Sequence, residues 1–243
     1  MDIDKILNYC DIANNKNNIN SDYIIIENKE TDILVLIIPD SFERKLYIIF
    51  RGPSNPSNIF DKNKIKQIKF INNCKVHSGF LNDYNSIKND LLLKIEKYNF
   101  YEMIACGHSL GGALAILFAC EFKKSCVTFG SPRVGDKIFC NIFKKNVEHG
   151  IRIIIIEDPI PFVFNDKYKH SIKPFCITDD KNIYYCEKEK KSFFSCINEK
   201  AKYDIKKHCL SAYKSHFDFN KYLEVLIEYN KNKHKYKKST FYK

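Results

Sequence analysis

The chain has 243 residues, 44% of them hydrophobic, which suits one α/β domain with a substantial core. The apolar runs Ile33–Ile38 and Ile151–Ile156 are strand-sized, whereas a membrane-spanning helix needs roughly 20 apolar residues. The formal net charge of +11 favours anionic surfaces, but no nucleic-acid-binding motif accompanies it. The composition therefore predicts a soluble globular protein and argues against a membrane-spanning or nucleic-acid-binding one.

The N-terminus and the cysteines bear on the cellular compartment. Acidic residues occupy the first positions, where a secretory signal would carry basic ones, and no long apolar stretch follows. The ten cysteines include no Cys-x-x-Cys pair, and the even spacing of Cys176, Cys186 and Cys196 matches no zinc pattern. We therefore expect a cytoplasmic protein with free thiols and with no metal or organic cofactor.

The first hundred residues predict a short helix, three strands and a longer helix. Residues 2–14 have helical spacing, and isoleucine-rich runs bounded by turn residues follow them. Between residues 81 and 98 apolar positions recur at helical spacing, which predicts one amphipathic helix. The three predicted strands are Tyr23–Glu27, Ile33–Ile38 and Lys45–Phe50.

From residue 103 onward, predicted strands and helices alternate. A short apolar strand runs into a helix of small residues, and a strand at Cys126–Phe129 follows. A helix near Asp136–Lys145 then leads to a strand at Ile151–Ile156. This alternation predicts a mostly parallel central sheet with helices on both faces.

The last part of the chain is rich in lysine. Residues 187–208 lack clear periodicity, which predicts an insertion or a mobile surface loop. A final amphipathic helix is predicted at Phe217–Tyr229. We expect one domain over residues 1–230 and a basic, flexible tail over residues 231–243. Together with Lys188–Lys191, the tail would permit peripheral contact with an anionic membrane or lipid surface.

Residues 107–111 read Gly-His-Ser-Leu-Gly, a G-x-S-x-G pattern between a predicted strand and a predicted helix. This setting is typical of a nucleophile elbow, in which the serine lies on a tight, strained turn and the two glycines allow close packing. The free N–H groups at the start of the helix would favour a developing negative charge. We therefore predict that Ser109 is a nucleophile and that the His108 side chain packs the turn.

A serine nucleophile needs a base to accept its proton and an acid to orient the base, and in this fold class they follow in the order serine, acid, histidine. Asp158 comes directly after the predicted strand of isoleucines, at the edge of the sheet where functional loops gather. Glu157 is its nearest competitor, whereas Asp136 suits a helix N-cap. We expect Asp158 to be the acid.

Four histidines after Asp158 are candidates for the base. His234 lies in the charged tail, His208 lies in the lysine-rich stretch, and His170 suits a structural role. His216 directly precedes the final predicted helix, where a loop could hold its imidazole above the sheet. We therefore expect His216 to be the base.

Six ordered blocks between residues 45 and 229 resemble the class 3 lipase family, the fungal triacylglycerol-lipase type of the α/β-hydrolases. They are Ile49-Phe50-Arg51-Gly52, His77-Ser78-Gly79-Phe80, Gly107 to Ala113, Thr128 to Gly135, Asp158-Pro159-Ile160-Pro161, and His216 with downstream Tyr222. The resemblance implies an α/β-hydrolase fold and the catalytic set Ser109, Asp158 and His216.

The resemblance also implies an oxyanion hole. Its first donor would be the N–H of Leu110, and its second would follow Gly52, where the family usually carries Ser or Thr. Here Pro53 occupies that position and has neither an N–H nor a hydroxyl, so we expect Ser54 to replace it. The family's lid would correspond to Ser57–Ile65, which a plain surface loop explains equally well.

The sequence thus predicts a serine-dependent hydrolase of lipid esters, such as a triacylglycerol, diacylglycerol or monoacylglycerol lipase. A phospholipase acting on anionic membranes is an alternative, favoured by the basic charge. A catalytically impaired scaffold used for binding is another, favoured by Pro53. The acyl-chain and head-group specificity and the oligomeric state stay open.

Overall fold

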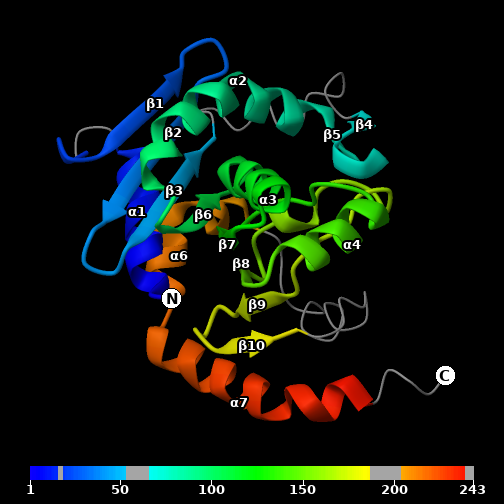
Figure 1. Ribbon diagram of the computed structural model, residues 1–243. Coiled ribbons are helices and arrows are strands. Elements are labelled where there is room, and N and C mark those ends of the chain that lie inside the picture. The colour runs from blue at the N-terminus through cyan, green and yellow to red at the C-terminus, as the bar shows by residue number, and fades with distance from the viewer. Residues whose placement is uncertain (16–18, 53–65, 187–203, 239–243) are drawn as a thin grey trace.

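A computed structural model of the chain describes residues 1–15, 19–52, 66–186 and 204–238 (Figure 1). Pro53, Ser54, the expected lid at residues 57–65 and Cys196 lie outside these ranges. No helix in the described ranges is long and apolar enough to cross a membrane.

The described residues form an eight-stranded sheet in the order β1-β2-β3-β6-β7-β8-β9-β10. The central strands β3, β6, β7, β8 and β9 are parallel, and antiparallel strands flank them at both edges. This arrangement confirms the predicted α/β fold. The strands are β1 (Ile24–Asn28), β2 (Ile33–Asp40), β3 (Lys45–Arg51), β6 (Glu102–His108), β7 (Ser125–Phe129), β8 (Gly150–Ile155), β9 (Pro174–Ile177) and β10 (Ile183–Tyr185).

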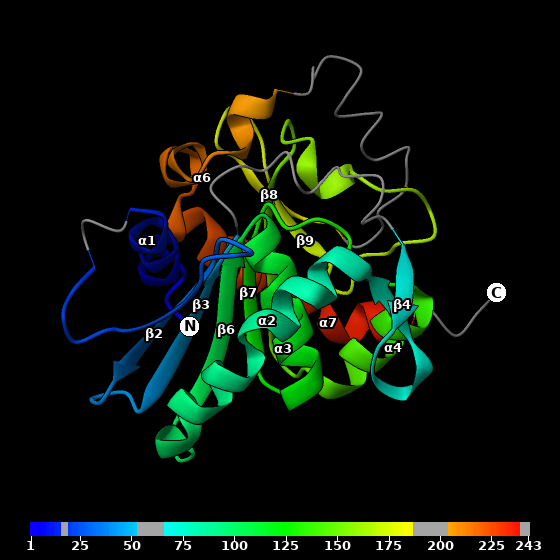
Figure 2. The same ribbon diagram turned by 90° about the horizontal axis from the view of Figure 1, so that it is seen from above.

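Helices cover both faces of the sheet, as Figures 1 and 2 show. One face packs on α2 (Ser78–Ile95), α3 (Leu110–Phe122) and α4 (Lys137–Asn146). The other packs on α1 (Ile3–Asn14), α6 (Leu210–His216) and the start of α7 (Phe219–Lys238). Alternate residues of β2 enter the two cores, which explains why this strand is almost entirely apolar.

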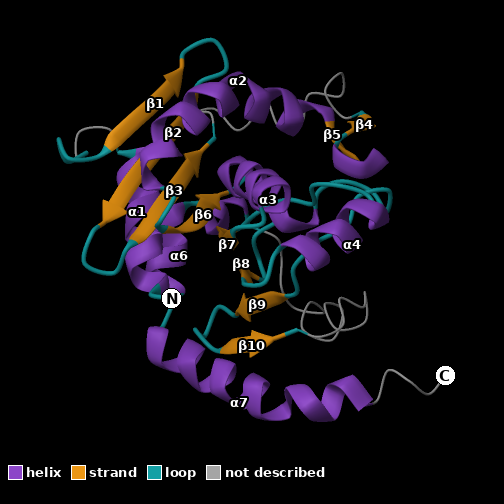
Figure 3. Ribbon diagram, viewed as in Figure 1, coloured by secondary structure: helices purple, strands orange, loops and turns teal. Residues whose placement is uncertain are grey.

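Short elements complete the fold, and Figure 3 shows two of them, β4 and β5, near one end of α2. A two-stranded sheet precedes α2, and the described part of the chain contains four 3₁₀ turns between the larger elements. These elements are β4 (Gln67–Lys69), β5 (Lys75–His77), η4 (Ile71–Asn73), η5 (Glu96–Tyr98), η6 (Ile160–Phe162) and η7 (Ile205–His208).

Helix α3 is buried on every side because it lies between the sheet and the neighbouring helices α2 and α4. Its first turn presses on the sheet. A Cβ atom on Gly111 would lie 2.0 Å from the carbonyl oxygen of Phe50, and one on Gly107 would lie 2.4 Å from the backbone of Gly111. Only glycine fits at these two positions, which confirms the reason for expecting them beside Ser109.

The predicted strands and long helices are present, with small shifts at their ends. Helix α2 begins three residues before its predicted start because the Nδ1 atom of His77 caps it, accepting the N–H of Phe80 at 3.4 Å. The short elements β10 and α6 were not predicted. Helix α7 continues to Lys238, so residues 231–238 of the expected tail are helical; the division of the chain at residue 230 stays a prediction.

Candidate active site

Ser109 lies on a strained turn between β6 and α3. Its backbone angles are φ 56° and ψ −127°, a region that residues with a side chain rarely occupy. The turn is held because the N–H of Ser109 donates to the carbonyl of Phe129 at 2.9 Å. Ser109 therefore stands at the carboxyl end of a central strand and at the N-terminus of a buried helix, as the G-x-S-x-G pattern predicts.

The Ser109 hydroxyl meets His208. Its Oγ atom lies 2.7 Å from Nε2 of His208, and Nδ1 of the same ring lies 2.8 Å from Oδ2 and 3.0 Å from Oδ1 of Asp158. Asp158 is fully buried, and His208 is 8% exposed. The three side chains thus form a continuous hydrogen-bonded chain that runs from Ser109 through His208 to Asp158. Along the sequence they occur in the order serine, acid, histidine.

Besides His208, two groups fix the carboxylate of Asp158. It lies three residues after the end of β8, at the carboxyl edge of the sheet as predicted, and its Oδ1 atom accepts the N–H of Ile160 at 2.9 Å. Its Oδ2 atom accepts the hydroxyl of Tyr213 at 2.7 Å, and that hydroxyl in turn accepts the N–H of Ile155 at 3.2 Å. Burial and the nearby carboxylate raise the pKa of Tyr213 well above its ordinary value, so the phenol stays protonated and donates.

The prediction that His216 meets Ser109 is wrong in this geometry. His216 is the last residue of α6, and its Nδ1 atom lies 2.8 Å from the carbonyl oxygen of Ala212. Its Nε2 atom lies 3.0 Å from Nζ of Lys207, which also pairs with Asp179. Because α6 starts at Leu210, the turn before this helix brings His208 to the site, whereas His216, at the end of the helix, points elsewhere.

His208 lies within the lysine-rich stretch that suggested a mobile loop, so its local composition concealed it. Its position at the end of η7 brings the ring over the carboxyl edge of the sheet. Tyr213, five residues after His208, was the sequence signal that could have identified this histidine. In the structure Tyr213 contacts Asp158, whereas Tyr222 packs beside Phe175 in the core. The block of His216 and Tyr222 is therefore not the one that lies beside Asp158.

The other candidates have structural positions. His170 is half-buried, and its Nε2 atom lies 2.6 Å from the carbonyl oxygen of Pro161. Asp136 caps α4 by accepting the N–H of Phe139 at 2.7 Å. Glu157 is partly buried, and burial raises its pKa, but Asp158 is the neighbour that contacts His208. The side chain of His234 lies outside the described part of the chain.

His108 packs the turn as expected and also touches the histidine of the site. Its Nε2 atom lies 2.6 Å from the backbone carbonyl oxygen of His208, and the centroids of the two rings are 4.7 Å apart. Burial, reinforced by His208, lowers the pKa of His108 to about 3. The ring is therefore neutral at ordinary pH, with Nε2–H as the donor.

Leu110 opens α3, where the first N–H groups of the helix have no partner within the helix. The end of β3 lies against this turn, since a Cβ atom on Gly52 would stand 2.9 Å from the Cβ of Leu110. The residues that follow Gly52, including Pro53 and Ser54, lie outside the described ranges. The structure thus places Gly52, the last described residue before the segment expected to carry the second oxyanion donor, next to the elbow.

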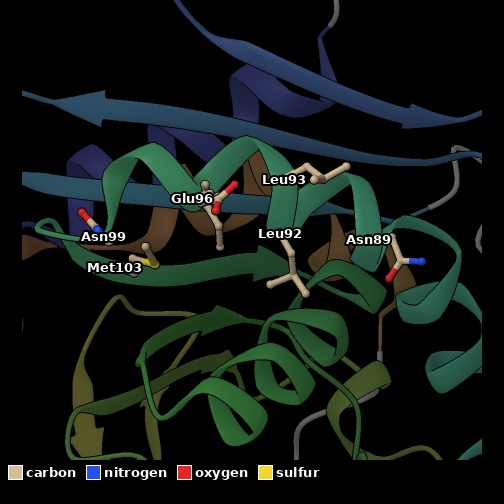
Figure 4. Close-up of a pocket in the computed structure, with 7 residues that line it drawn as sticks. Asn89, Leu92, Leu93, Glu96, Asn99 and Met103 are labelled. Carbon is tan, nitrogen blue, oxygen red and sulfur yellow. The ribbon is translucent and has the colours of Figure 1, made fainter.

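A pocket of about 650 Å³ lies at the other end of β6 (Figure 4). Met103 lines it near the start of the strand, whereas Ser109 follows the end of the strand, about 20 Å away at 3.3 Å per residue. This pocket is therefore separate from the Ser109 site. Its lining residues are Asn89, Leu92, Leu93, Ile95, Glu96, Asn99 and Met103. Within the described ranges, no group of three or more His, Cys, Asp or Glu residues could hold a metal ion.

Comparison with known proteins identifies the family of this chain. The model of the class 3 lipase family matches residues 47–168, which is half of the chain. A lipase from Rhizomucor miehei is 31% identical over 126 residues, covering 45% of this chain and 35% of that protein. The secreted mono- and diacylglycerol lipase 1 of Fusarium solani is 26% identical over 143 residues, covering 54% of this chain and 43% of that protein. The matched segments thus span less than half of these relatives.

The fold has solved counterparts. A triacylglycerol lipase whose catalytic centre is described as a serine protease triad superposes with a TM-score of 0.64 and 26% identity. The superposition covers 77% of this chain and 79% of the lipase. These lipases have the α/β-hydrolase fold that the sequence predicted.

The expected cytoplasmic location is contradicted by the relatives. The Fusarium solani lipase is secreted, and the Rhizomucor miehei lipase has been solved in complex with a propeptide. The acidic N-terminus and the many cysteines therefore do not establish a cytoplasmic protein.

Proposed function

The chain belongs to the class 3 lipase family, and from this membership and the geometry at Ser109 we propose that it hydrolyses carboxylic esters of lipids. The observation that carries the proposal is the 2.7 Å contact between Oγ of Ser109 and Nε2 of His208. A serine hydroxyl is a weak nucleophile until a base accepts its proton, and a contact of this length permits that transfer. His208 takes the role that the sequence suggested for His216.

Asp158 prepares His208 for this role. The contact of 2.8 Å to Nδ1 places the ring proton on that nitrogen, which leaves the lone pair of Nε2 facing Ser109. The carboxylate also stabilises the imidazolium that forms when His208 accepts the proton. Tyr213 holds Asp158 by its hydroxyl and acts as a positioning residue.

The proposed reaction is an acyl transfer through a covalent intermediate on Ser109. Ser109 Oγ attacks the ester carbonyl as His208 takes its proton, and the imidazolium returns this proton to the departing alcohol. Water next attacks the acyl-enzyme with His208 again as base, which releases the fatty acid and restores Ser109. No cofactor takes part in these steps.

The oxyanion of the tetrahedral intermediate needs donors. The N–H of Leu110 is one, because the first turn of α3 offers free N–H groups and the positive end of the helix dipole. Ser54 is the proposed second donor, since Pro53 has neither an N–H nor a hydroxyl. Loss of one such donor typically lowers the rate by roughly 100- to 1,000-fold. Ser54→Ala should show a loss of this size, and full activity would reject Ser54 as a donor.

Acylglycerols are the proposed substrate class, because the Fusarium solani relative is named for mono- and diacylglycerols. A phospholipase is the second candidate, favoured by the net charge of +11, which would draw the protein to anionic membranes. A panel of tri-, di- and monoacylglycerols and anionic phospholipids, each tested with wild type and Ser109→Ala, separates the two. Hydrolysis of the phospholipids alone would overturn the acylglycerol assignment.

A fluorophosphonate probe tests the hydrolase proposal independently of substrate choice. We expect wild type to be labelled on Ser109 and Ser109→Ala to stay unlabelled. Absence of labelling in folded wild type would reject the hydrolase and favour a catalytically impaired binding scaffold. Circular dichroism of both proteins shows that they are folded.

A further inference from the structure

Two cysteines on the hairpin β9–β10 have their sulfur atoms close together. The Sγ atoms of Cys176 and Cys186 lie 2.6 Å apart. Sulfur atoms in ordinary van der Waals contact are separated by roughly an ångström more than this, whereas a disulfide bond is about 2.05 Å long. The pair is therefore already closer than non-bonded contact.

The backbone accounts for this approach. Cys176 lies opposite Tyr184 in the β9–β10 ladder, and the N–H of Cys186 donates to the carbonyl of Pro174 at 3.0 Å, which continues the ladder by one residue pair. The cysteines are thus diagonal neighbours on one face of the hairpin. Both side chains are buried in a small cluster with Ile154 and Ile156 of the β8 region.

We propose that Cys176 and Cys186 form an intramolecular disulfide when the chain folds in the presence of an oxidising disulfide. One thiolate attacks the external disulfide and releases one thiol, and the other thiolate then attacks the mixed disulfide and releases the second thiol. The two cysteines lose two electrons and two protons, and the external disulfide takes them up as two thiols. Because both sulfurs are buried, the exchange occurs before the hairpin packs on β8.

The bond would secure the segment between the acid and the base. Strand β9 pairs with β8, which ends three residues before Asp158, and Cys186 begins the stretch of chain that leads to His208. A covalent link at Cys186 would fix the start of this stretch to β9. The closed loop is short, so the gain in stability falls at the lower end of the range for disulfides.

Mass spectrometry of the full chain tests the bond without any assay of activity. The protein is refolded with reduced and oxidised glutathione, denatured without reductant, alkylated and digested. We expect a cross-linked peptide that joins Cys176 to Cys186 and splits on reduction. Alkylation of both cysteines, or a bond from either one to Cys196 instead, would overturn the proposal.

Thermal unfolding provides a second readout. Reduction of the wild-type disulfide should lower Tm by roughly 5 °C. Cys176→Ala and Cys186→Ala should have the same Tm with and without reductant. Cys126→Ala is the matched control, since this buried cysteine on β7 lies apart from the pair, and it should keep the wild-type response. Equal responses of all four proteins would contradict the bond, whatever their esterase activity.

Discussion

The Nε2 atom of His108 lies 2.6 Å from the backbone carbonyl oxygen of His208, so the residue before the proposed nucleophile holds the residue proposed to receive its proton. The two rings also pack together, with centroids 4.7 Å apart. Burial lowers the pKa of His108 to about 3, which keeps it neutral and therefore outside the proton transfer. The nucleophile elbow and the 3₁₀ turn η7 are thus joined directly, although 100 residues separate them in sequence.

Replacing His108 should affect turnover through His208. His108→Phe keeps an aromatic ring but removes the donor, and we expect kcat to fall about fivefold with little change in KM, since one hydrogen bond is worth roughly 1 kcal/mol. His108→Gln retains an N–H donor and should recover part of the loss. Steady-state kinetics on a soluble ester measures both. Equal kcat values for the two variants would show that the hydrogen bond has no part in positioning His208.

Tyr213→Phe should weaken both stability and turnover. The change removes the 2.7 Å bond to Asp158 and leaves the buried N–H of Ile155 without its acceptor. We expect unfolding to become easier by about 1–3 kcal/mol in urea, together with a lower kcat. Tyr222→Phe is the matched control, because the buried hydroxyl of Tyr222 has no partner in the described part of the chain. A loss as large in Tyr222→Phe would contradict a specific role for the Tyr213 hydroxyl.

Stability should fall in mild acid because of buried histidines. Burial lowers the pKa of His77 to about 4 and that of His108 to about 3, against 6.5 for an exposed histidine. Between pH 6.5 and 4 these two histidines bind protons in the unfolded chain but stay neutral in the folded chain. The free energy of unfolding therefore decreases as the pH falls. Each histidine contributes up to about 1.4 kcal/mol per pH unit.

Urea unfolding at pH 5.0–6.5, above the range where most carboxylates titrate, measures this slope. His77→Gln should flatten it, whereas His149→Gln, which alters a histidine 64% exposed, should leave it unchanged. A stability that is level across this interval would contradict burial of His77 and His108 in neutral form.

Gly111→Ala should disrupt the elbow. The added Cβ would lie 2.0 Å from the carbonyl oxygen of Phe50, which is backbone and cannot move aside. We expect a loss of at least about 3 kcal/mol in unfolding free energy, or failure to fold. In Gly150→Ala the nearest atoms belong to the flexible side chain of Ile172 at 3.3 Å, so this control should fold. Wild-type stability of Gly111→Ala would contradict the close packing of α3 on β3.

The residues of the site whose positions depend on neighbouring sequence could be predicted, whereas the residue whose position depends on long-range packing could not. Ser109 was predictable because strand, turn and helix are adjacent in the chain, and Asp158 because it closely follows an isoleucine-rich strand. His208 was not, because its position depends on the packing of η7 and α6 against His108 and Asp158. The composition around His208 instead suggested an exposed loop, and the amphipathic helix after His216 gave that residue a more convincing setting.

The choice of base is the central claim, and kcat/KM of two variants tests it most directly. His208→Ala should lose at least about 1,000-fold on a soluble ester, since removal of a triad base leaves only binding and oxyanion stabilisation. His216→Ala should stay within about threefold of wild type, because its ring contacts Ala212, Ser215 and Lys207. A large loss in His216→Ala with near-wild-type activity in His208→Ala would contradict the site described above.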